Sequence, residues 1–315
     1  MNKQVVLLDG GMGQELIRRY GAPPTPLWST EVMQQDPNLV RQVHSDFIRA
    51  GATVITVNAY TVTPERLARD GIADQFESLQ QTACQLARQA RDECSRDQGR
   101  GQDIRIAGCL PPLVASYRPD DVPDNNQLRS SWRRIVEQQA PYVDLIIAET
   151  LSTVREAQIA AEVIAEYGLP GWIAMTVTDR QGDQLRSGQP LRDVARAAAI
   201  GGAQAVLVNC SWPEAVPAAL AVLQASGLAC GAYANGFTGI AALQKGGTVD
   251  VLQARTDIYP TAYADHGEQW LTQGASIVGG CCEIGPGHIA ALAERLSARG
   301  YLAVSQLPVP QPAAQ

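Results

Sequence analysis

The chain has 315 residues, of which 45% are hydrophobic and 18% are charged. This composition suffices for a large buried core and excludes a disordered chain, a collagen-like repeat or a small disulfide scaffold. The formal net charge is -7 and no basic run is present, which argues against nucleic acid and anionic membrane surfaces as partners. An enzyme acting on small molecules is therefore the expected class, and the oligomeric state is left open.

The first apolar stretch and the cysteines bear on the cellular compartment. Val5 to Leu8 is too short for a signal-peptide core or a membrane span, so the expected location is the cytoplasm. The chain has seven cysteines, and an odd number in a reducing compartment indicates free thiols or metal ligands rather than a disulfide framework.

Short apolar runs alternate along the chain with longer segments of helical periodicity, which is typical of a parallel α/β sheet. Strands are predicted at Val5–Asp9, Val54–Asn58, Ile104–Gly108, Leu145–Glu149, Trp172–Val177, Ala205–Asn209, Gly231–Ala234 and Ser276–Gly280. Helices are predicted at Pro37–Ala50, Ala73–Arg96, Ser130–Gln139, Thr153–Tyr167, Leu191–Ile200, Pro213–Ala225, Thr261–Gln273 and Gly287–Arg299.

The lengths of the connections indicate the fold class. Glycines such as Gly51 and Gly201-Gly202 mark short turns from helix to strand, whereas connections that leave the strands are long, as at Asn235–Pro260. A barrel with its site on one face has this asymmetry. The sequence therefore predicts an α/β fold, a closed (β/α)8 TIM barrel in a single domain of residues 1–303, followed by a flexible C-terminal tail at 304–315. An open doubly wound sheet is the alternative.

Three cysteines, Cys210, Cys281 and Cys282, follow the ends of predicted strands. Alternate side chains of a strand point to opposite faces, so both members of the adjacent pair reach one ion only where the strand has ended. Three thiolates with one open position form a tetrahedral zinc site that binds a substrate as the fourth ligand. The other four are predicted to be small core residues: Cys84 and Cys94 in a helix, Cys109 after the third strand, and Cys230 at the start of a strand.

The charge of such a centre indicates its chemistry. Three thiolates on a dication leave a net charge of about -1, which suits a thiol substrate better than formation of a hydroxide. The bound sulfur stays nucleophilic, and the anionic centre attracts a cationic alkyl donor. The predicted chemistry is thiol alkylation, with the zinc-activated substrate thiolate as the nucleophile and no other catalytic residue.

Two carboxylates, Asp9 and Glu149, also end predicted strands, and Gly10 and Gly11 follow the first of them. Two carboxylates on one rim can hold an α-ammonium group, and the glycines allow a ligand to approach the backbone. A surface ion pair or a helix cap is the alternative for either carboxylate. A phosphate loop at Gly10 to Gly13 is disfavoured because no Lys-Ser/Thr follows it.

These motifs together resemble the homocysteine S-methyltransferase family, in the family's order from Val5 to Arg299. The matching residues are Asp9-Gly10-Gly11, Glu149-Thr150, Asn209-Cys210, Gly279-Gly280-Cys281-Cys282, Pro286 and His288-Ile289. The resemblance implies a zinc barrel with Cys210, Cys281 and Cys282 as the metal ligands. It also implies that Asp9 and Glu149 hold the homocysteine amino group, that Gly10 and Gly11 lie against the amino acid, and that Asn209 is a further substrate-binding residue.

The family's reaction transfers a methyl group to homocysteine and gives methionine. This chain lacks the C-terminal extension of betaine users, so it is most similar to members that use S-methylmethionine or S-adenosylmethionine. Departures at Thr261-Ala262-Tyr263 and Glu283-Ile284 are expected on the rim of the site. Because of these departures, betaine or another onium compound is an alternative donor, and another thiol is an alternative acceptor.

Two other classes of protein are considered. The first is a zinc-binding barrel without catalysis. The second is a barrel isomerase or lyase for phosphorylated sugars, which is disfavoured because Gly279-Gly280-Cys281-Cys282 stands where its anion site would be.

Overall fold

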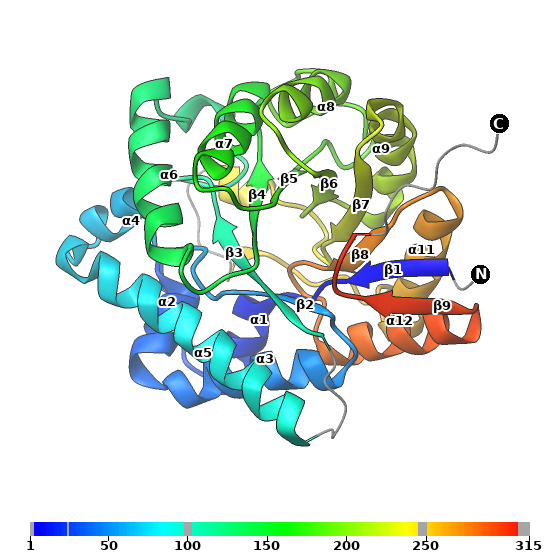
Figure 1. Ribbon diagram of the computed structural model, residues 1–315, viewed down its shortest axis with the longest axis horizontal. Helices are drawn as coiled ribbons and strands as arrows, with labels where there is room; N and C mark the ends of the chain where they lie inside the picture. The colour runs from blue at the N-terminus through cyan, green and yellow to red at the C-terminus, as the bar shows by residue number, and fades with distance from the viewer. Residues whose placement is uncertain (1–2, 24, 98–102, 245–250, 308–315) are drawn as a thin grey trace.

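The computed structural model describes residues 3–23, 25–97, 103–244 and 251–307. One curled sheet of nine parallel strands lies at its centre, with helices around the outside (Figure 1). The strands are β1 Lys3–Leu7, β2 Val54–Thr56, β3 Arg105–Leu110, β4 Leu145–Leu151, β5 Gly171–Met175, β6 Ala205–Asn209, β7 Ala229–Ala234, β8 Ile277–Gly280 and β9 Tyr301–Val304. Their order across the sheet is β2-β3-β4-β5-β6-β7-β8-β1-β9.

The helices follow the strands in the predicted alternation, which confirms a single-domain α/β fold. They are α1 Met12–Tyr20, α2 Trp28–Gln35, α3 Pro37–Arg49, α4 Pro64–Arg69, α5 Phe76–Asp97, α6 Asn125–Gln139, α7 Val154–Glu166, α8 Leu191–Ile200, α9 Val216–Leu223, α10 Ala241–Gln244, α11 Pro260–Thr272 and α12 Pro286–Ala298. All eight predicted strands and all eight predicted helical segments are present, with ends shifted by a few residues. None of the helices in the described part of the chain has the length and apolarity of a membrane span.

Both faces of the sheet are buried, which explains the near-continuous apolar runs of its strands. In β1, Val5 and Leu7 belong to the core between the sheet and the helices. Val6 and the following Leu8 point the other way, into a second core that includes Trp172. The side chains of the strands therefore fill the inner face of the sheet themselves.

The edge of β1 that faces away from β8 is shared by two partners. The first residues of β1 pair in parallel with β9, from Lys3 opposite Tyr301 onward. Beyond the end of β1, Leu8 forms a parallel bridge with Val54 of β2, and the Asp9 amide donates to the Val54 carbonyl at 3.1 Å. The two ends of the eight-strand series thus meet at this bridge.

The strand β9 lies outside the predicted pattern and reaches the start of the expected tail. Val304 ends β9, and Ser305, which follows it, is buried. The rest of the expected tail, residues 308–315, lies outside the described residues.

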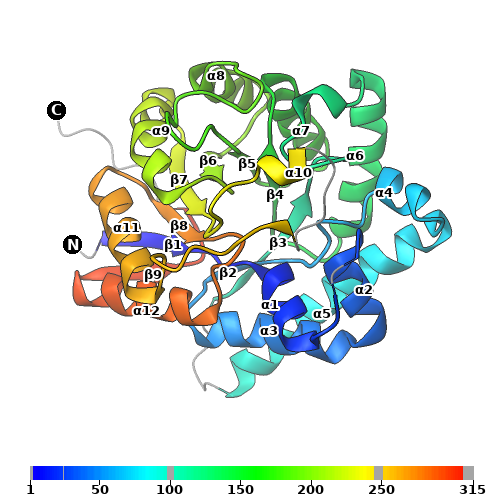
Figure 2. The same ribbon diagram turned by 180° about the vertical axis from the view of Figure 1, so that it is seen from behind.

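Long connections follow the carboxyl ends of the strands. The view from behind in Figure 2 shows the short helix α10, which belongs to the connection between β7 and α11, in front of the strands near the centre of the molecule.

Candidate metal and substrate site

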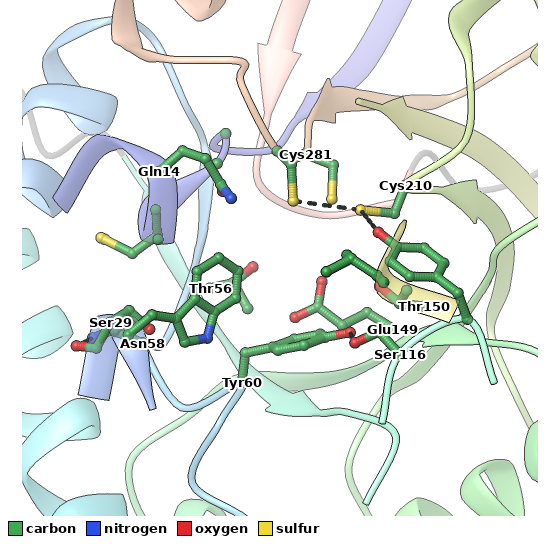
Figure 3. A pocket seen from close by; sticks show the side chains of 18 of the residues that line it. Gln14, Ser29, Thr56, Asn58, Tyr60, Ser116, Glu149, Thr150, Cys210 and Cys281 are labelled. Carbon is green, nitrogen blue, oxygen red and sulfur yellow. Dashed lines mark hydrogen bonds between the residues drawn. The ribbon is translucent and has the colours of Figure 1, made fainter. Parts of the chain in front are cut away.

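The three predicted metal ligands lie together. Cys210 follows β6, Cys281 and Cys282 follow β8, and their Sγ atoms all lie within 4.8 Å of one another (Figure 3). The Sγ atoms of Cys210 and Cys282 are 3.7 Å apart. Two sulfurs at about 2.3 Å from a tetrahedral zinc ion are roughly 3.8 Å apart. The thiols therefore fit a zinc ion.

The backbone around β7 fixes the position of these cysteines. The amide of Cys210 donates to the Tyr233 carbonyl at 3.2 Å, and the amide of Cys281 donates to the Ala234 carbonyl at 2.9 Å. Cys210 has φ 47°, in the left-handed region. This sharp turn directs the chain out of β6, and strained backbone of this kind occurs mainly where surrounding structure requires it, often at functional sites.

The three thiols influence one another through hydrogen bonds. Hydrogen bonds from Cys281 and Cys282 hold the pKa of Cys210 well below its ordinary value, and the Tyr117 hydroxyl donates to the same Sγ at 3.1 Å. The pKa values of Cys281 and Cys282 are raised well above their ordinary value, first through these bonds to Cys210. A metal binds the thiolate form of each cysteine, so metal binding would displace the protons that these thiols carry.

The two predicted carboxylates line the same cavity as the cysteines. Asp9 is buried, and its Oδ2 accepts from the Thr56 amide at 2.8 Å. Burial raises the pKa of Asp9 to about 8 and that of Glu149 to about 7. A desolvated carboxylate is stabilised by a cation, so this pair favours an ammonium group on the ligand.

Two residues that were not predicted to belong to the site hold Glu149. The Cys109 thiol donates to Oε1 at 3.0 Å, and the Tyr233 hydroxyl donates to Oε2 at 3.4 Å (Glu149 is labelled in Figure 3). The prediction that Cys109 follows the third strand is wrong, because it lies within β3. The predicted strand ended at Gly108, two residues before the end of β3, and this hid the contact.

Asn209 faces the protein rather than the cavity. It is fully buried and is absent from the described residues that line the cavity. Its Oδ1 accepts from the Thr150 amide at 2.9 Å, and its Nδ2 donates to the Thr150 hydroxyl at 2.8 Å. Asn209 thus ties the end of β6 to the end of β4, beside Glu149, where Thr150 has φ 60°.

Gly10 and Gly11 line the cavity and also permit a close approach within the protein. A Cβ at Gly10 would lie 2.1 Å from the Ile284 carbonyl oxygen, and one at Gly11 would lie 2.5 Å from the Cys281 carbonyl oxygen. The glycines therefore let the turn before α1 pack against the segment that carries the cysteine pair. Contact between this backbone and a ligand stays a prediction.

The cavity has a volume of about 400 Å³. Trp28 and Tyr60 form part of its wall, with ring centroids 6.5 Å apart and planes nearly perpendicular. Gln14 in α1 directs its carboxamide toward the interior in Figure 3, and its buried Nε2 has no hydrogen-bond partner among the described residues. The short element α4 contributes Arg66. Tyr60 was near a predicted strand end, whereas Gln14 and Arg66 carried no signal in the sequence.

The departures from the family motif do not line the cavity, which corrects the expectation that they form its rim. Tyr263 is fully buried in α11, and its hydroxyl donates to the Gly279 carbonyl at 2.6 Å. None of Thr261, Ala262, Tyr263, Glu283 and Ile284 is among the described residues that line the cavity.

The fold and this site define an α/β protein with a thiol cluster suited to a metal and a carboxylate pair suited to an ammonium ligand. The sequence profile described as Homocysteine S-methyltransferase matches residues 6–296. The chain belongs to the homocysteine S-methyltransferase family.

Individual relatives are similar over nearly the whole chain. The homocysteine S-methyltransferase of Escherichia coli (strain K12) is 31% identical, covering 94% of this chain and 96% of that protein. The S-methylmethionine–homocysteine S-methyltransferase of Mus musculus is 28% identical, covering 95% of this chain and 80% of that protein. The crystal structure of the homocysteine methyltransferase MmuM from Escherichia coli in its metallated form has a TM-score of 0.79 at 30% identity, covering 93% of this chain and 97% of that chain.

Proposed function

We propose that this protein transfers a methyl group from a sulfonium donor, S-methylmethionine or S-adenosylmethionine, to the thiol of homocysteine, giving methionine. The observation that carries the proposal is the position of the cysteine cluster and the pair Asp9 and Glu149 around one cavity. Homocysteine has a thiol that a metal held by the cysteines would bind, and an ammonium group that the two carboxylates would bind. The family membership and the names of the relatives support the same reaction.

Cys210, Cys281 and Cys282 would hold the zinc ion, which when bound supplies a Lewis acid that lowers the pKa of a thiol substrate. Asp9 and Glu149 would bind and orient the homocysteine ammonium, and the backbone of Gly10 and Gly11 would lie along the amino acid. We propose a positioning role for Asn209, through Thr150, in place of substrate contact.

The residues around the cavity suit an in-line displacement at the methyl carbon. The buried carboxylates and thiols make the inner end anionic, which attracts a cationic donor. A new bond forms between the homocysteine sulfur and the methyl carbon as the bond from that carbon to the sulfonium breaks. The leaving group departs as a neutral thioether, and alignment of the two sulfurs by the cavity walls lowers the barrier.

We also propose that β1 to β8 form a closed (β/α)8 barrel within a single domain that runs through β9. The bridge from Leu8 to Val54 and the core on the inner face of the sheet support closure. The seven unpaired thiols support a reducing compartment, and the cytoplasm is the location we propose.

A donor panel tests the proposed function. Purified zinc-loaded protein is given homocysteine with S-methylmethionine, S-adenosylmethionine, betaine or a methylated folate at equal concentration, and methionine is measured. We expect a sulfonium to be used far better than betaine or the folate. A preference for betaine would contradict the donor assignment, and zinc retention without methionine from any donor would indicate a non-catalytic zinc-binding barrel.

A further inference from the structure

Arg66, on the cavity wall, is buried without an acidic partner. The whole residue is 8% exposed. Its Nη2 donates to the Pro112 carbonyl at 3.0 Å, and its Nε has no hydrogen-bond partner among the described residues. No described carboxylate forms an ion pair with it. Arg186, whose side chain is 7% exposed, pairs with Asp179 at 2.8 Å. Arg66 therefore lacks the carboxylate partner that the buried Arg186 has.

An anionic ligand would stabilise the buried positive charge of Arg66. A guanidinium keeps its proton even when buried, and a buried charge without a counterion is unfavourable. The Tyr60 ring, with its centroid 5.3 Å from the guanidinium carbon, offsets part of the cost through its electron-rich face. The Tyr60 hydroxyl is a neutral acceptor beside the guanidinium, whereas a carboxylate matches both the charge and the planar donor geometry of the guanidinium.

Arg66 reaches the cavity from a different part of the fold than the cysteines. Arg66 lies in α4, after β2, whereas the cysteines follow β6 and β8. In Figure 3, Tyr60 lies across the cavity from Cys281. Arg69 and Arg118 also line the cavity, but they pair with Asp70 and Asp121. Arg66 is thus the cavity arginine whose charge is uncompensated by a described residue.

We propose that Arg66 binds the carboxylate of the methyl donor, so that the donor is a zwitterion with an onium group at one end and a carboxylate at the other. This inference rests on the proposed function and assigns to Arg66 the selection of donors that carry a carboxylate, as S-methylmethionine and S-adenosylmethionine do, over a sulfonium without one. The onium lies toward the cysteines and carboxylates, and the donor carboxylate lies on the guanidinium. A simple sulfonium without a carboxylate would leave Arg66 unpaired.

The test compares two donors, each assayed with the wild-type protein and with a variant of Arg66. S-methylmethionine and its methyl ester carry the same sulfonium, but the ester has no α-carboxylate. With the wild-type protein, we expect the KM for the ester to exceed that for S-methylmethionine by at least about tenfold. Arg66→Gln should raise the KM for S-methylmethionine by a similar factor and remove the difference between the two donors. The KM for homocysteine and the zinc content should not change.

Two further variants complete the design. Arg66→Lys, which keeps the charge, should restore part of the discrimination. Arg133→Gln removes an exposed arginine paired with Glu166, and it should leave both donors unchanged. Thermal unfolding of each variant reports on folding. If Arg66→Gln does not fold, the wild-type comparison and Arg66→Lys decide the question.

Three results would overturn the inference: equal use of acid and ester by the wild-type protein, retained discrimination in Arg66→Gln, or a rise confined to the KM for homocysteine. The last result would assign Arg66 to the acceptor. A wild-type protein that forms no methionine from any donor would instead reject the proposed function. Calorimetric binding of S-methylmethionine and its ester to the wild-type and Arg66→Gln proteins would then still test the carboxylate site.

Discussion

Asp9 is a buried carboxyl group whose protonation the fold controls. Burial raises its pKa to about 8, against the hydrogen bonds donated by Thr56. In the unfolded chain the pKa is about 3.9. The folded protein therefore retains a proton that the unfolded chain loses above pH about 4. The contribution of Asp9 to the free energy of unfolding is fully present below the pKa of Asp9 in the unfolded chain. It is lost as the pH rises to about 8.

Asp9→Asn should remove this pH dependence. Without metal or ligand, the free energy of unfolding of the variant should gain on that of the wild type by up to about 1.4 kcal/mol per pH unit between the two pKa values. Urea unfolding from pH 5 to 8 measures the difference. Asparagine keeps an acceptor for Thr56, and Glu149 titrates in both proteins. Parallel stability curves would show that Asp9 has an ordinary pKa.

Glu149 should determine the affinity for the amino acid and not for the metal. Glu149→Gln keeps the size of the side chain and an acceptor for Cys109 but removes the charge. The loss of one charged partner of a desolvated ammonium costs on the order of 2 to 5 kcal/mol, so the KM for homocysteine should rise at least about 30-fold with zinc retained. Glu162→Gln, at a half-buried ion pair with Arg129 outside the cavity lining, is the control. Wild-type kinetics in Glu149→Gln would make Glu149 a structural carboxylate.

At the scale of elements, the turn between β1 and α1 supports the segment that follows β8. Gly10→Ala would place a Cβ 2.1 Å from the Ile284 carbonyl oxygen and 2.8 Å from Cε1 of Phe47. The first contact is with backbone, so the segment that carries Cys281 and Cys282 must shift. We expect a loss of about 1 to 3 kcal/mol in unfolding free energy and faster loss of zinc to a chelator.

Gly239→Ala is the matched control for this change, because a Cβ there meets no atom within 4 Å. It should leave both the urea midpoint and the rate of zinc loss as in the wild type. Equal zinc retention in Gly10→Ala and Gly239→Ala would mean that the β1–α1 turn does not position the cysteine pair.

The strands could be predicted from the sequence because burial on both faces makes them short apolar runs. The helix α1 could not, since Gly10 to Gly13 resembles a loop, and burial of Leu16 together with the pairing of Glu15 to Arg19 stabilises the helix instead. The strand β9 also escaped prediction. Its short sequence forms a strand only because β1 offers an edge.

The same distinction applies to the site. Cys210 and Cys281 could be predicted because each directly follows a strand, and Glu149 because it lies near the carboxyl end of one. Cys109 was assigned to the wrong side of a strand end. Arg66 reaches the cavity from α4, a helix that the sequence did not predict, and its lack of an acidic partner is a property of the folded chain alone.

At the scale of the whole molecule, the parallel sheet brings distant residues to one end. Cys210 and the pair Cys281-Cys282 come from two strands separated by β7, so no local segment holds all three thiols. Zinc affinity should therefore depend on the intact fold, and bound zinc should in turn raise the stability of the folded chain.

We propose that these three thiols hold the zinc ion required for methyl transfer. Zinc content and methionine formation from homocysteine and S-methylmethionine, measured on the same preparations of wild type, Cys281→Ser and Cys84→Ser, test it most directly. Cys84 is a buried thiol of α5, and burial raises its pKa to about 12. We predict about one zinc per chain and full activity in the wild type and Cys84→Ser, and the loss of both in Cys281→Ser. Retention of zinc and activity in Cys281→Ser would contradict the account.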